Sequence, residues 1–293
     1  MPKVLANGIQ IHYQQAGAGQ DLVLIHPVAA DLSLWYLHVM PALAKEFRVT
    51  AYDMRGHGYS EATPSGYTSA HMAEDLHGLL VSLGIERAHL VGYSFGGSVA
   101  LHCAVLYPTR VASLVLADPA MPAFMPMVDL ERWAHVEDYR TTLKEYGMSV
   151  PEDRLFDLEC LAPQILHAAL PIGLRRGLRQ LRRKALRTIE STSVLREAQE
   201  VAGLTVERIA EVRHPALALY GKSSPFLQMA WYLQEKVPSC QVVVVEDSSH
   251  FFTATKPQLF LAGISDFLRQ MRLESALGAV EQGVGIRSGG QSR

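Results

Sequence analysis

The sequence predicts an α/β protein in which a mostly parallel, doubly wound sheet carries a helical cap insertion. Three observations support this fold class. Short apolar segments alternate with amphipathic ones along most of the 293 residues, as expected when each parallel strand is followed by a helix that covers the sheet. The alternation stops between residues 118 and 213, where helical patterns dominate. A Gly-x-Ser-x-Gly segment at residues 92–96 stands between a strand-like and a helix-like segment.

The first half of the chain supplies most of the predicted strands. Asn7-Gly8 predicts a hairpin turn before an alternating strand at 9–13. The continuous apolar run at 22–25 is typical of a strand buried in a parallel sheet. The further elements expected here are helices at 33–45, 68–83 (opened by Thr68 or Ser69 as cap) and 97–106, and strands at 48–52, 88–91 and 111–117.

The second half closes the sheet and sets the domain boundaries. We expect strands at 216–220 and 241–245, a helix at 227–236 between them and a closing helix at 257–273. Residues 1–117 and 214–275 are therefore expected to form the core domain. Residues 118–213 are expected to form a helical cap over the carboxyl ends of the strands, where such sheets bind ligands. The glycine-rich, polar tail at 276–293 is expected to be disordered.

The composition narrows the range of partners. The formal net charge of -2 provides no global attraction to nucleic acid or anionic membranes. No run reaches the ~20 apolar residues of a membrane helix, and no signal peptide is expected. Cys103, Cys160 and Cys240 are sparse and odd in number, and none stands in a metal-type pair. They predict a cytoplasmic, reducing compartment.

A basic segment lies inside the predicted cap. Residues 173–189 carry seven arginines and lysines opposite a face of leucines and alanine at helical spacing. This pattern predicts an amphipathic helix with a solvated basic face. The alternative is a docking site for an acidic carrier protein or an anionic substrate. A homodimer is also compatible with the sequence.

Ser94 is the predicted nucleophile. A serine between a strand and a helix can sit on a sharp elbow with its Oγ exposed. Its hydroxyl needs a base, and among the twelve histidines only His250 follows the last predicted strand, where the base is expected. The oxyanion formed on attack needs backbone N–H donors, and we expect them from Phe95 and Val28. Pro27 has no N–H to donate but can stiffen the turn.

These blocks resemble the α/β-hydrolase superfamily, in its large capped group. His26-Pro27 with Trp35 resembles the family's His-Gly…Trp block, and residues 53–60 resemble its Asp-x-Arg-Gly-x-Gly-x-Ser loop. The elbow resembles Gly-x-Ser-x-Gly-Gly, and His250 stands where the family has Gly-His. The resemblance covers residues 1–272 and implies an α/β-hydrolase fold, with a structural role for the Asp53 loop.

The chain departs from the family pattern at two positions. Pro27 replaces a glycine in the oxyanion turn, and Ser224 stands where the catalytic carboxylate is expected. Three explanations are open: Asp118, which follows the strand at 111–117, takes the acid role; the reaction needs no full triad; or the site is vestigial and binds a ligand. A loop aspartate that only caps the turn at Pro119 is the structural alternative for Asp118.

The identity of the predicted nucleophile narrows the range of possible reactions. Haloalkane dehalogenases and epoxide hydrolases of this fold have aspartate at the elbow, so Ser94 argues against both. The function expected is hydrolysis of a carboxylic ester, lactone or thioester through an acyl-enzyme, with the pattern nearest to enol-lactonases and esterases. A lyase or cyclase of secondary metabolism and a ligand-binding protein are the alternatives. The substrate is expected to be a small molecule, and no metal or organic cofactor is implied.

The substrate pocket is expected to be mostly apolar and to lie under the cap, above Ser94. Flexible thioether and aromatic side chains suit an acyl ligand, although each is equally compatible with ordinary core packing. The candidates to line it are His26, Trp35, Met121, Phe124 and Met125.

Overall fold

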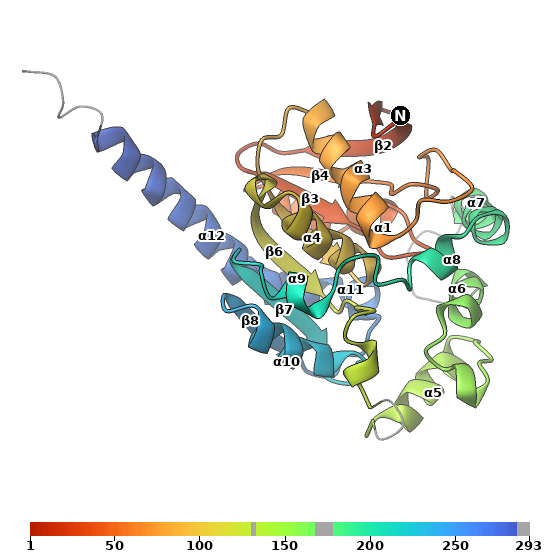
Figure 1. Cartoon of the computed structure of the whole chain (residues 1–293). Helices are drawn as coiled ribbons and strands as arrows, with labels where there is room; N and C mark the ends of the chain where they lie inside the picture. Colours follow the sequence, from red (N-terminus) through yellow and green to blue (C-terminus); the bar gives the residue numbers. More distant parts are fainter. Residues whose placement is uncertain (130–132, 168–177, 286–293) are drawn as a thin grey trace, which may run out of the picture.

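One eight-stranded sheet organises the computed structural model, which describes residues 1–129, 133–167 and 178–285 (Figure 1). The order is β1-β2-β4-β3-β5-β6-β7-β8; β1 and β4 pair with β2 antiparallel, and all other pairs are parallel. The strands are β1 Lys3–Ala6, β2 Ile9–Ala16, β3 Asp21–Ile25, β4 Arg48–Tyr52, β5 Ala88–Tyr93, β6 Val111–Ala117, β7 Ala216–Gly221 and β8 Cys240–Val245. The predicted mostly parallel sheet is confirmed.

Helices cover both faces of the sheet, which makes it doubly wound. Alternate residues of β3 enter different clusters: Val23 and Ile25 pack with α3 and α4, whereas Leu22 and Leu24 pack with α1, α2 and α12. The core helices are α1 Ser33–Tyr36, α2 Val39–Leu43, α3 Ser69–Ser82, α4 Phe95–Leu106, α10 Leu227–Lys236, α11 Phe252–Thr255 and α12 Pro257–Gly285.

Local sequence signals set several element boundaries. Asn7 and Gly8 both have positive φ (47° and 79°), as the hairpin between β1 and β2 requires. The Thr68 hydroxyl accepts the N–H of His71 and caps α3. The helix predicted at 33–45 is instead two short helices, α1 and α2. Pro41 explains the break, because its ring collides with the carbonyl four residues earlier in a continuous helix.

The C-terminal segment also differs from the prediction. Helix α12 continues to Gly285, although we expected disorder from residue 276. Ala276, Leu277 and Ala279 are strong helix formers and favour its continuation, whereas Gly278, Gly283 and Gly285 do not. Residues 286–293 of the predicted tail lie outside the described residues. Among the described residues, no helix combines the length and apolar character that a bilayer span requires.

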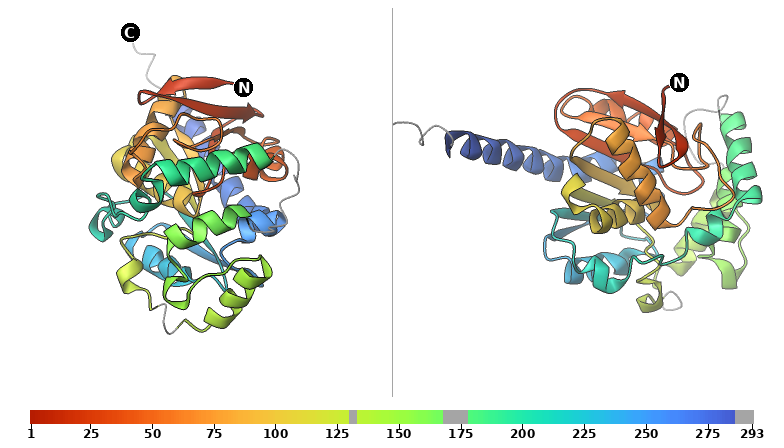
Figure 2. Two further views of the ribbon diagram at one scale, coloured as in Figure 1. Left: turned by 90° about the vertical axis from the view of Figure 1, so that its right-hand side faces the viewer. Right: turned by 45° about the horizontal axis from the view of Figure 1, so that its top comes forward.

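Helices gather at the carboxyl ends of the strands, as Figures 1 and 2 show. No strand occurs between residues 118 and 213 where the structure describes them, and we retain this range as the proposed cap. Its longer helices are α5 Val136–Glu145, α6 Leu158–His167 and α7 Leu178–Ser191; α8 Val194–Glu197 and α9 Val206–Ile209 are single turns. Tyr139, Leu143, Leu155 and Leu161 pack with Phe251 in a small separate core.

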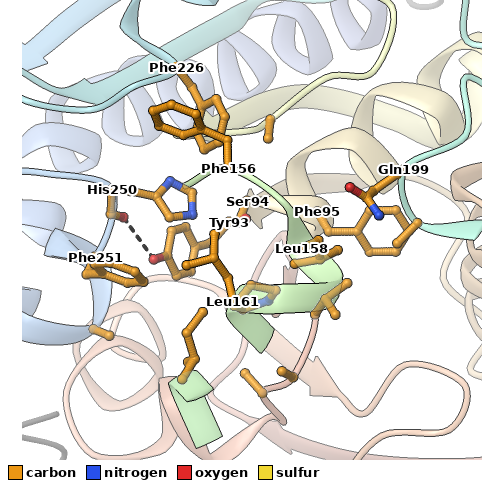
Figure 3. A pocket seen from close by; sticks show the side chains of 18 of the residues that line it. Tyr93, Ser94, Phe95, Phe156, Leu158, Leu161, Gln199, Phe226, His250 and Phe251 are labelled. Carbon is orange, nitrogen blue, oxygen red and sulfur yellow. Dashed lines mark hydrogen bonds between the residues drawn. The ribbon is translucent and has the colours of Figure 1, made fainter. Parts of the chain in front are cut away.

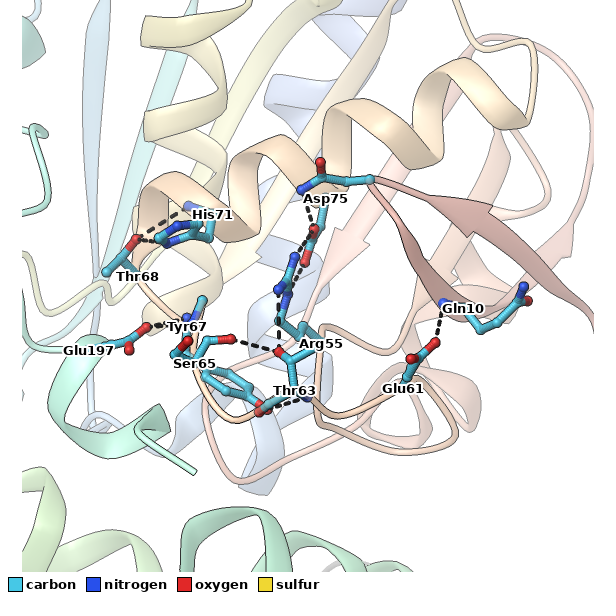
Figure 4. A network of polar contacts seen from close by, with 12 residues as sticks. Gln10, Arg55, Glu61, Thr63, Ser65, Tyr67, Thr68, His71, Asp75 and Glu197 are labelled. Atoms are coloured by element: carbon cyan, nitrogen blue, oxygen red, sulfur yellow. Dashed lines mark hydrogen bonds and ion pairs between the residues drawn. The ribbon is translucent and has the colours of Figure 1, made fainter. Parts of the chain in front are cut away.

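Polar contacts attach the cap to the loop after β4. Glu197 accepts the backbone N–H groups of Gly66 (2.9 Å) and Tyr67 (2.5 Å), beside the bidentate pair of Arg55 with Asp75 (Figure 4). The predicted basic cap helix falls partly on residues 168–177, which are outside the described residues. In its described part Arg183 and Arg187 are exposed, but Lys184 donates to the Ser60 carbonyl at 2.9 Å.

Candidate active site

Ser94 occupies a strained turn between β5 and α4. Its φ of 53° and ψ of −123° lie outside the regions that L-residues favour. Glycines on both sides allow this turn. A Cβ at Gly92 would lie 2.2 Å from the Gly96 carbonyl oxygen, and one at Gly96 would lie 2.4 Å from that of Ile25. The glycines of the Gly-x-Ser-x-Gly segment therefore let backbones approach where no side chain fits.

Asp118 follows β6 and points to the loop that carries His250. Its carboxylate is fully buried, and Oδ1 lies 2.9 Å from His250 Nδ1, within the roughly 2.6–3.2 Å expected for such a pair. Because a carboxylate only accepts hydrogen bonds, Nδ1 is the donor, and Nε2 is left for another partner. Asp118 also lies against Gly221, whose N–H donates to Oδ2 at 2.9 Å.

Ser224 does not simply replace an acid with an inert residue. Its hydroxyl is buried and donates to Asp118 Oδ1 at 2.5 Å, the same oxygen that His250 contacts. The family pattern leads us to expect the carboxylate at Ser224. This position instead supplies a donor to the carboxylate of Asp118, which follows the neighbouring strand β6. This contact could not be inferred from the sequence, because it depends on the spacing of the carboxyl ends of β6 and β7.

His250 faces the pocket that Ser94 also lines. Its side chain is 13% exposed, and Tyr93 Oη donates to the His250 backbone carbonyl at 2.8 Å. In Figure 3 the imidazole points toward Ser94. Ser94 and His250 thus line one pocket, and the Asp118 carboxylate contacts the His250 imidazole.

The loop after β3 borders the same pocket. Val28 and Phe95 both line it, and Phe95 is the first residue of α4, so its N–H has no acceptor within the helix. The turn is fixed from outside the pocket: His26 Nδ1 donates to the Pro27 carbonyl at 2.8 Å, and His26 Nε2 accepts the Met54 N–H at 3.0 Å.

The pocket between core and cap is mostly apolar. Its volume is about 390 Å³, a size that suits a small organic ligand. Of the predicted lining residues, Met125 is in the wall. His26 is not, because both ring nitrogens are engaged in the buried turn. Trp35 is not in the wall either, because it packs against Phe260 in the buried cluster that α2 and α12 form on one face of the sheet.

Met121 and Phe124 are also absent from the wall. Both are fully buried in the main core cluster. The Met121 N–H faces Met229 Sδ of α10 at 3.2 Å, and the Phe124 ring lies 5.7 Å from that of Tyr232 on the same helix. The expectation that they line the pocket was wrong because residues of this segment face different sides: Ala120, Pro122 and Met125 line the cavity, whereas Met121 and Phe124 pack on α10.

Several residues of the wall were missed. Tyr139 and Phe156 come from the cap, and Phe226 and Phe251 follow the β7 and β8 strands. Phe251 could have been found from its position next to His250. The cap residues carry no local signal, because only the folded cap brings them to the pocket. Asp31 is a polar exception in the wall, and burial raises the pKa of its carboxyl.

A second aspartate–histidine pair lies away from the pocket. Asp53 accepts from His12 Nδ1 at 2.7 Å and from the N–H groups of Leu32 and Tyr59 at 2.9 and 2.7 Å. Burial opposes ionisation of Asp53, but these hydrogen bonds outweigh it and lower its pKa. Nearby, burial lowers the pKa of His57 to about 4.

Comparisons with known proteins agree with this architecture. A family model described as the alpha/beta hydrolase fold matches residues 22–257. A 2-hydroxymuconate semialdehyde hydrolase from Pseudomonas sp. (strain CF600) is 41% identical over 125 residues, which are 42% of this chain; the matched segment covers 44% of that relative, less than half its length.

Two other similarities extend over nearly the whole chain. A 2-hydroxy-6-oxo-2,4-heptadienoate hydrolase from Pseudomonas putida is 27% identical over 90% of this chain and 95% of its own length. The crystal structure of the enol-lactonase from Burkholderia xenovorans LB400 superposes with a TM-score of 0.68 at 24% identity, covering 92% of this chain and 100% of that one. At that identity, the likeness concerns the fold.

Proposed function

Because this chain belongs to the α/β-hydrolase fold family, we propose that it is a serine hydrolase that cleaves a carboxylic ester, lactone or thioester through an acyl-enzyme. The observation that carries the proposal is that Ser94 and His250 line one apolar pocket, while the buried Asp118 contacts the His250 imidazole. Ser94 attacks the carbonyl carbon while His250 takes the hydroxyl proton. Asp118 holds the His250 tautomer and stabilises the imidazolium.

The oxyanion and the second half-reaction complete the proposal. The N–H groups of Val28 and Phe95 donate to the carbonyl oxygen as it becomes an oxyanion. The intermediate collapses, the bond to the leaving group breaks, and His250 returns its proton to that group. Water, deprotonated by His250, then attacks the acyl carbon, the bond from that carbon to Ser94 Oγ breaks, His250 returns the proton to Ser94, and the carboxylic acid leaves. The direct contact of Asp118 with His250 supports this reading over a site without an acid.

We also propose a cytoplasmic location and a small-molecule substrate. The free state of Cys103, Cys160 and Cys240 supports a reducing, cytoplasmic compartment. A homodimer and an acidic carrier protein stay hypotheses. For the substrate, the mostly apolar wall supports an uncharged small molecule.

Covalent labelling tests the nucleophile. A fluorophosphonate should label the wild-type chain at Ser94 and fail to label Ser94→Ala. The variant should keep its fold by circular dichroism, while ester turnover falls by at least about 10³-fold. Ser98→Ala is the matched control, because Ser98 lies four residues further along the chain, in α4, where it is buried. Turnover by Ser94→Ala close to that of wild type would refute the assignment.

A further inference from the structure

Aromatic rings surround His250 on the side away from Phe95. The Phe226 and Phe251 rings lie 5.2 and 5.5 Å from the imidazole, both nearly perpendicular to it. Tyr93 lies 5.5 Å from it in a tilted arrangement. Phe226, Phe251 and Tyr93 all line the pocket, and Figure 3 shows His250 among these rings.

The cap supplies two more rings to this end of the pocket. Tyr139 and Phe156 stack on each other at 5.5 Å with an interplanar angle of 10°, and both line the cavity. Tyr139 and Phe251 belong to one buried cluster, with Phe156 packed against it. Core and cap therefore form a continuous aromatic wall next to the imidazole. We call Tyr139, Phe156, Phe226 and Phe251 the aromatic subsite.

The other end of the pocket differs in character. Gln199 and Val201 line the pocket, and both are exposed. In Figure 3 Gln199 lies near Phe95, on the opposite side of Ser94 from His250 and Phe226. The pocket thus has an enclosed aromatic end at His250 and an open end beyond Phe95.

The proposed chemistry assigns the two ends to the two halves of an ester. When the tetrahedral intermediate collapses, the bond between the carbonyl carbon and the leaving oxygen breaks, and His250 donates its proton to that oxygen. The leaving oxygen must therefore lie within hydrogen-bond reach of the imidazole. With the carbonyl oxygen directed at Val28 and Phe95, the alcohol part extends among the rings around His250 and the acyl part toward the open end.

We propose that the aromatic subsite binds the leaving group, and that the preferred substrates are esters of aryl-bearing alcohols with a short acyl part. This inference rests on the proposed function. Aromatic rings prefer edge-to-face or offset contacts with other rings, and these add to the effect of burial. A flat ring on the alcohol can make such contacts with Phe226 and Phe156, whereas a ring on the acyl side would pass Phe95 and Leu158 toward the exposed Gln199 and would meet fewer rings.

Two isomeric esters test this inference. Benzyl acetate and methyl phenylacetate are isomers, and the alcohols that they release have similar acidity. They carry the phenyl ring on opposite sides of the ester bond. For the wild-type chain, kcat/KM for benzyl acetate should exceed that for methyl phenylacetate by about tenfold or more, as expected from burying one phenyl ring.

Variants connect the preference to the subsite. Phe226→Ala and, independently, Phe156→Leu should each reduce the ratio of the two kcat/KM values by at least about threefold. One variant lies in the core and the other in the cap, so a folding defect in one leaves the other informative. Trp231→Ala, at an exposed position of α10 outside the pocket, should leave the ratio unchanged.

The outcomes separate the two proposals. Turnover of both esters with a ratio near one, or in favour of methyl phenylacetate, overturns the aromatic subsite and leaves the serine hydrolase assignment standing. An unchanged ratio in both Phe226→Ala and Phe156→Leu also overturns the subsite. If neither ester is turned over and the fluorophosphonate does not label Ser94, the proposed function fails and this inference fails with it.

Discussion

Asp53 and Asp118 both follow a strand of the sheet, and both accept a hydrogen bond from a histidine Nδ1, yet their histidines reach different surroundings. His12, the partner of Asp53, is 3% exposed, and its Nε2 has no hydrogen-bond partner among the described residues. His250, the partner of Asp118, is 13% exposed and lines the pocket with Ser94. A buried carboxylate with a histidine is therefore no mark of catalysis by itself.

The remaining contacts of the two aspartates also differ. Asp53 accepts backbone N–H groups from two loops, at Leu32 and Tyr59, and it packs so closely on Gly58 that a Cβ there would lie 2.0 Å from the carboxylate. Asp118 contacts His250, Ser224 and the Gly221 N–H, all near the pocket. We infer that Asp53 stabilises loops, whereas Asp118 orients a base.

Removing each charge should separate the two roles most clearly. Asp118→Asn should lower kcat by about 10⁴-fold, because an amide cannot hold the reactive tautomer or stabilise imidazolium. Asp53→Asn should lower the free energy of unfolding by about 2–3 kcal/mol, because buried donors lose a charged acceptor, with kcat of the folded protein changed less than about tenfold. Ester kinetics and urea unfolding of both variants check this; interchanged phenotypes would contradict it.

Acid should act on stability through buried histidines, of which His57 lies near Asp53. The folded pKa of His57, about 4, lies below its unfolded value of about 6.5. The unfolded chain therefore takes up a proton that the folded chain does not. The stability contributed by neutral His57 is complete above pH ~6.5 and is lost as the pH falls towards ~4, by about 3 kcal/mol.

Urea unfolding at a series of pH values measures this loss. His57→Gln cannot titrate and should show a shallower decline than wild type. His89 and His102, whose pKa values burial also lowers to about 4, should maintain part of the slope. A stability that does not change between pH 7 and pH 4.5 would refute the role of these buried histidines.

The smallest expected effect concerns Ser224. Its hydroxyl contacts the Asp118 oxygen that also faces His250, so Ser224→Ala should reduce kcat by about tenfold with KM nearly unchanged. Ser224→Thr should recover most of the loss, because it restores a hydroxyl. Ser223→Ala is the matched control on the same loop. Equal kcat for Ser224→Ala and wild type would show that Asp118 needs no such support.

Much of the fold was accessible from the sequence because its signals are local. Thr68 caps α3 as predicted, and the strands at 48–52 and 111–117 match the predictions residue for residue. The predicted helix at 33–45 shows the limit of pattern reading. Apolar spacing indicated one helix, but the covalent ring of Pro41 divides it into two.

The pocket was less accessible because it depends on long-range packing. Trp35 and Phe124 were candidates by proximity in the chain to functional segments, but their side chains enter the core on either side of the sheet. Conversely, Phe156 lies far from Ser94 in the sequence and reaches the cavity only through the folded cap. Sequence indicates which residue types suit a site, whereas packing determines which of them face it.

The backbone of Ser94 has a consequence for engineering. A non-glycine residue at φ 53°, ψ −123° is unfavourable by roughly 1–3 kcal/mol, and the surrounding packing holds it there. Random mutagenesis selected only for heat resistance should therefore favour glycine at this position, and the resulting enzymes would be robust but inactive. Screens for thermostability on this scaffold therefore need an assay of activity in every round.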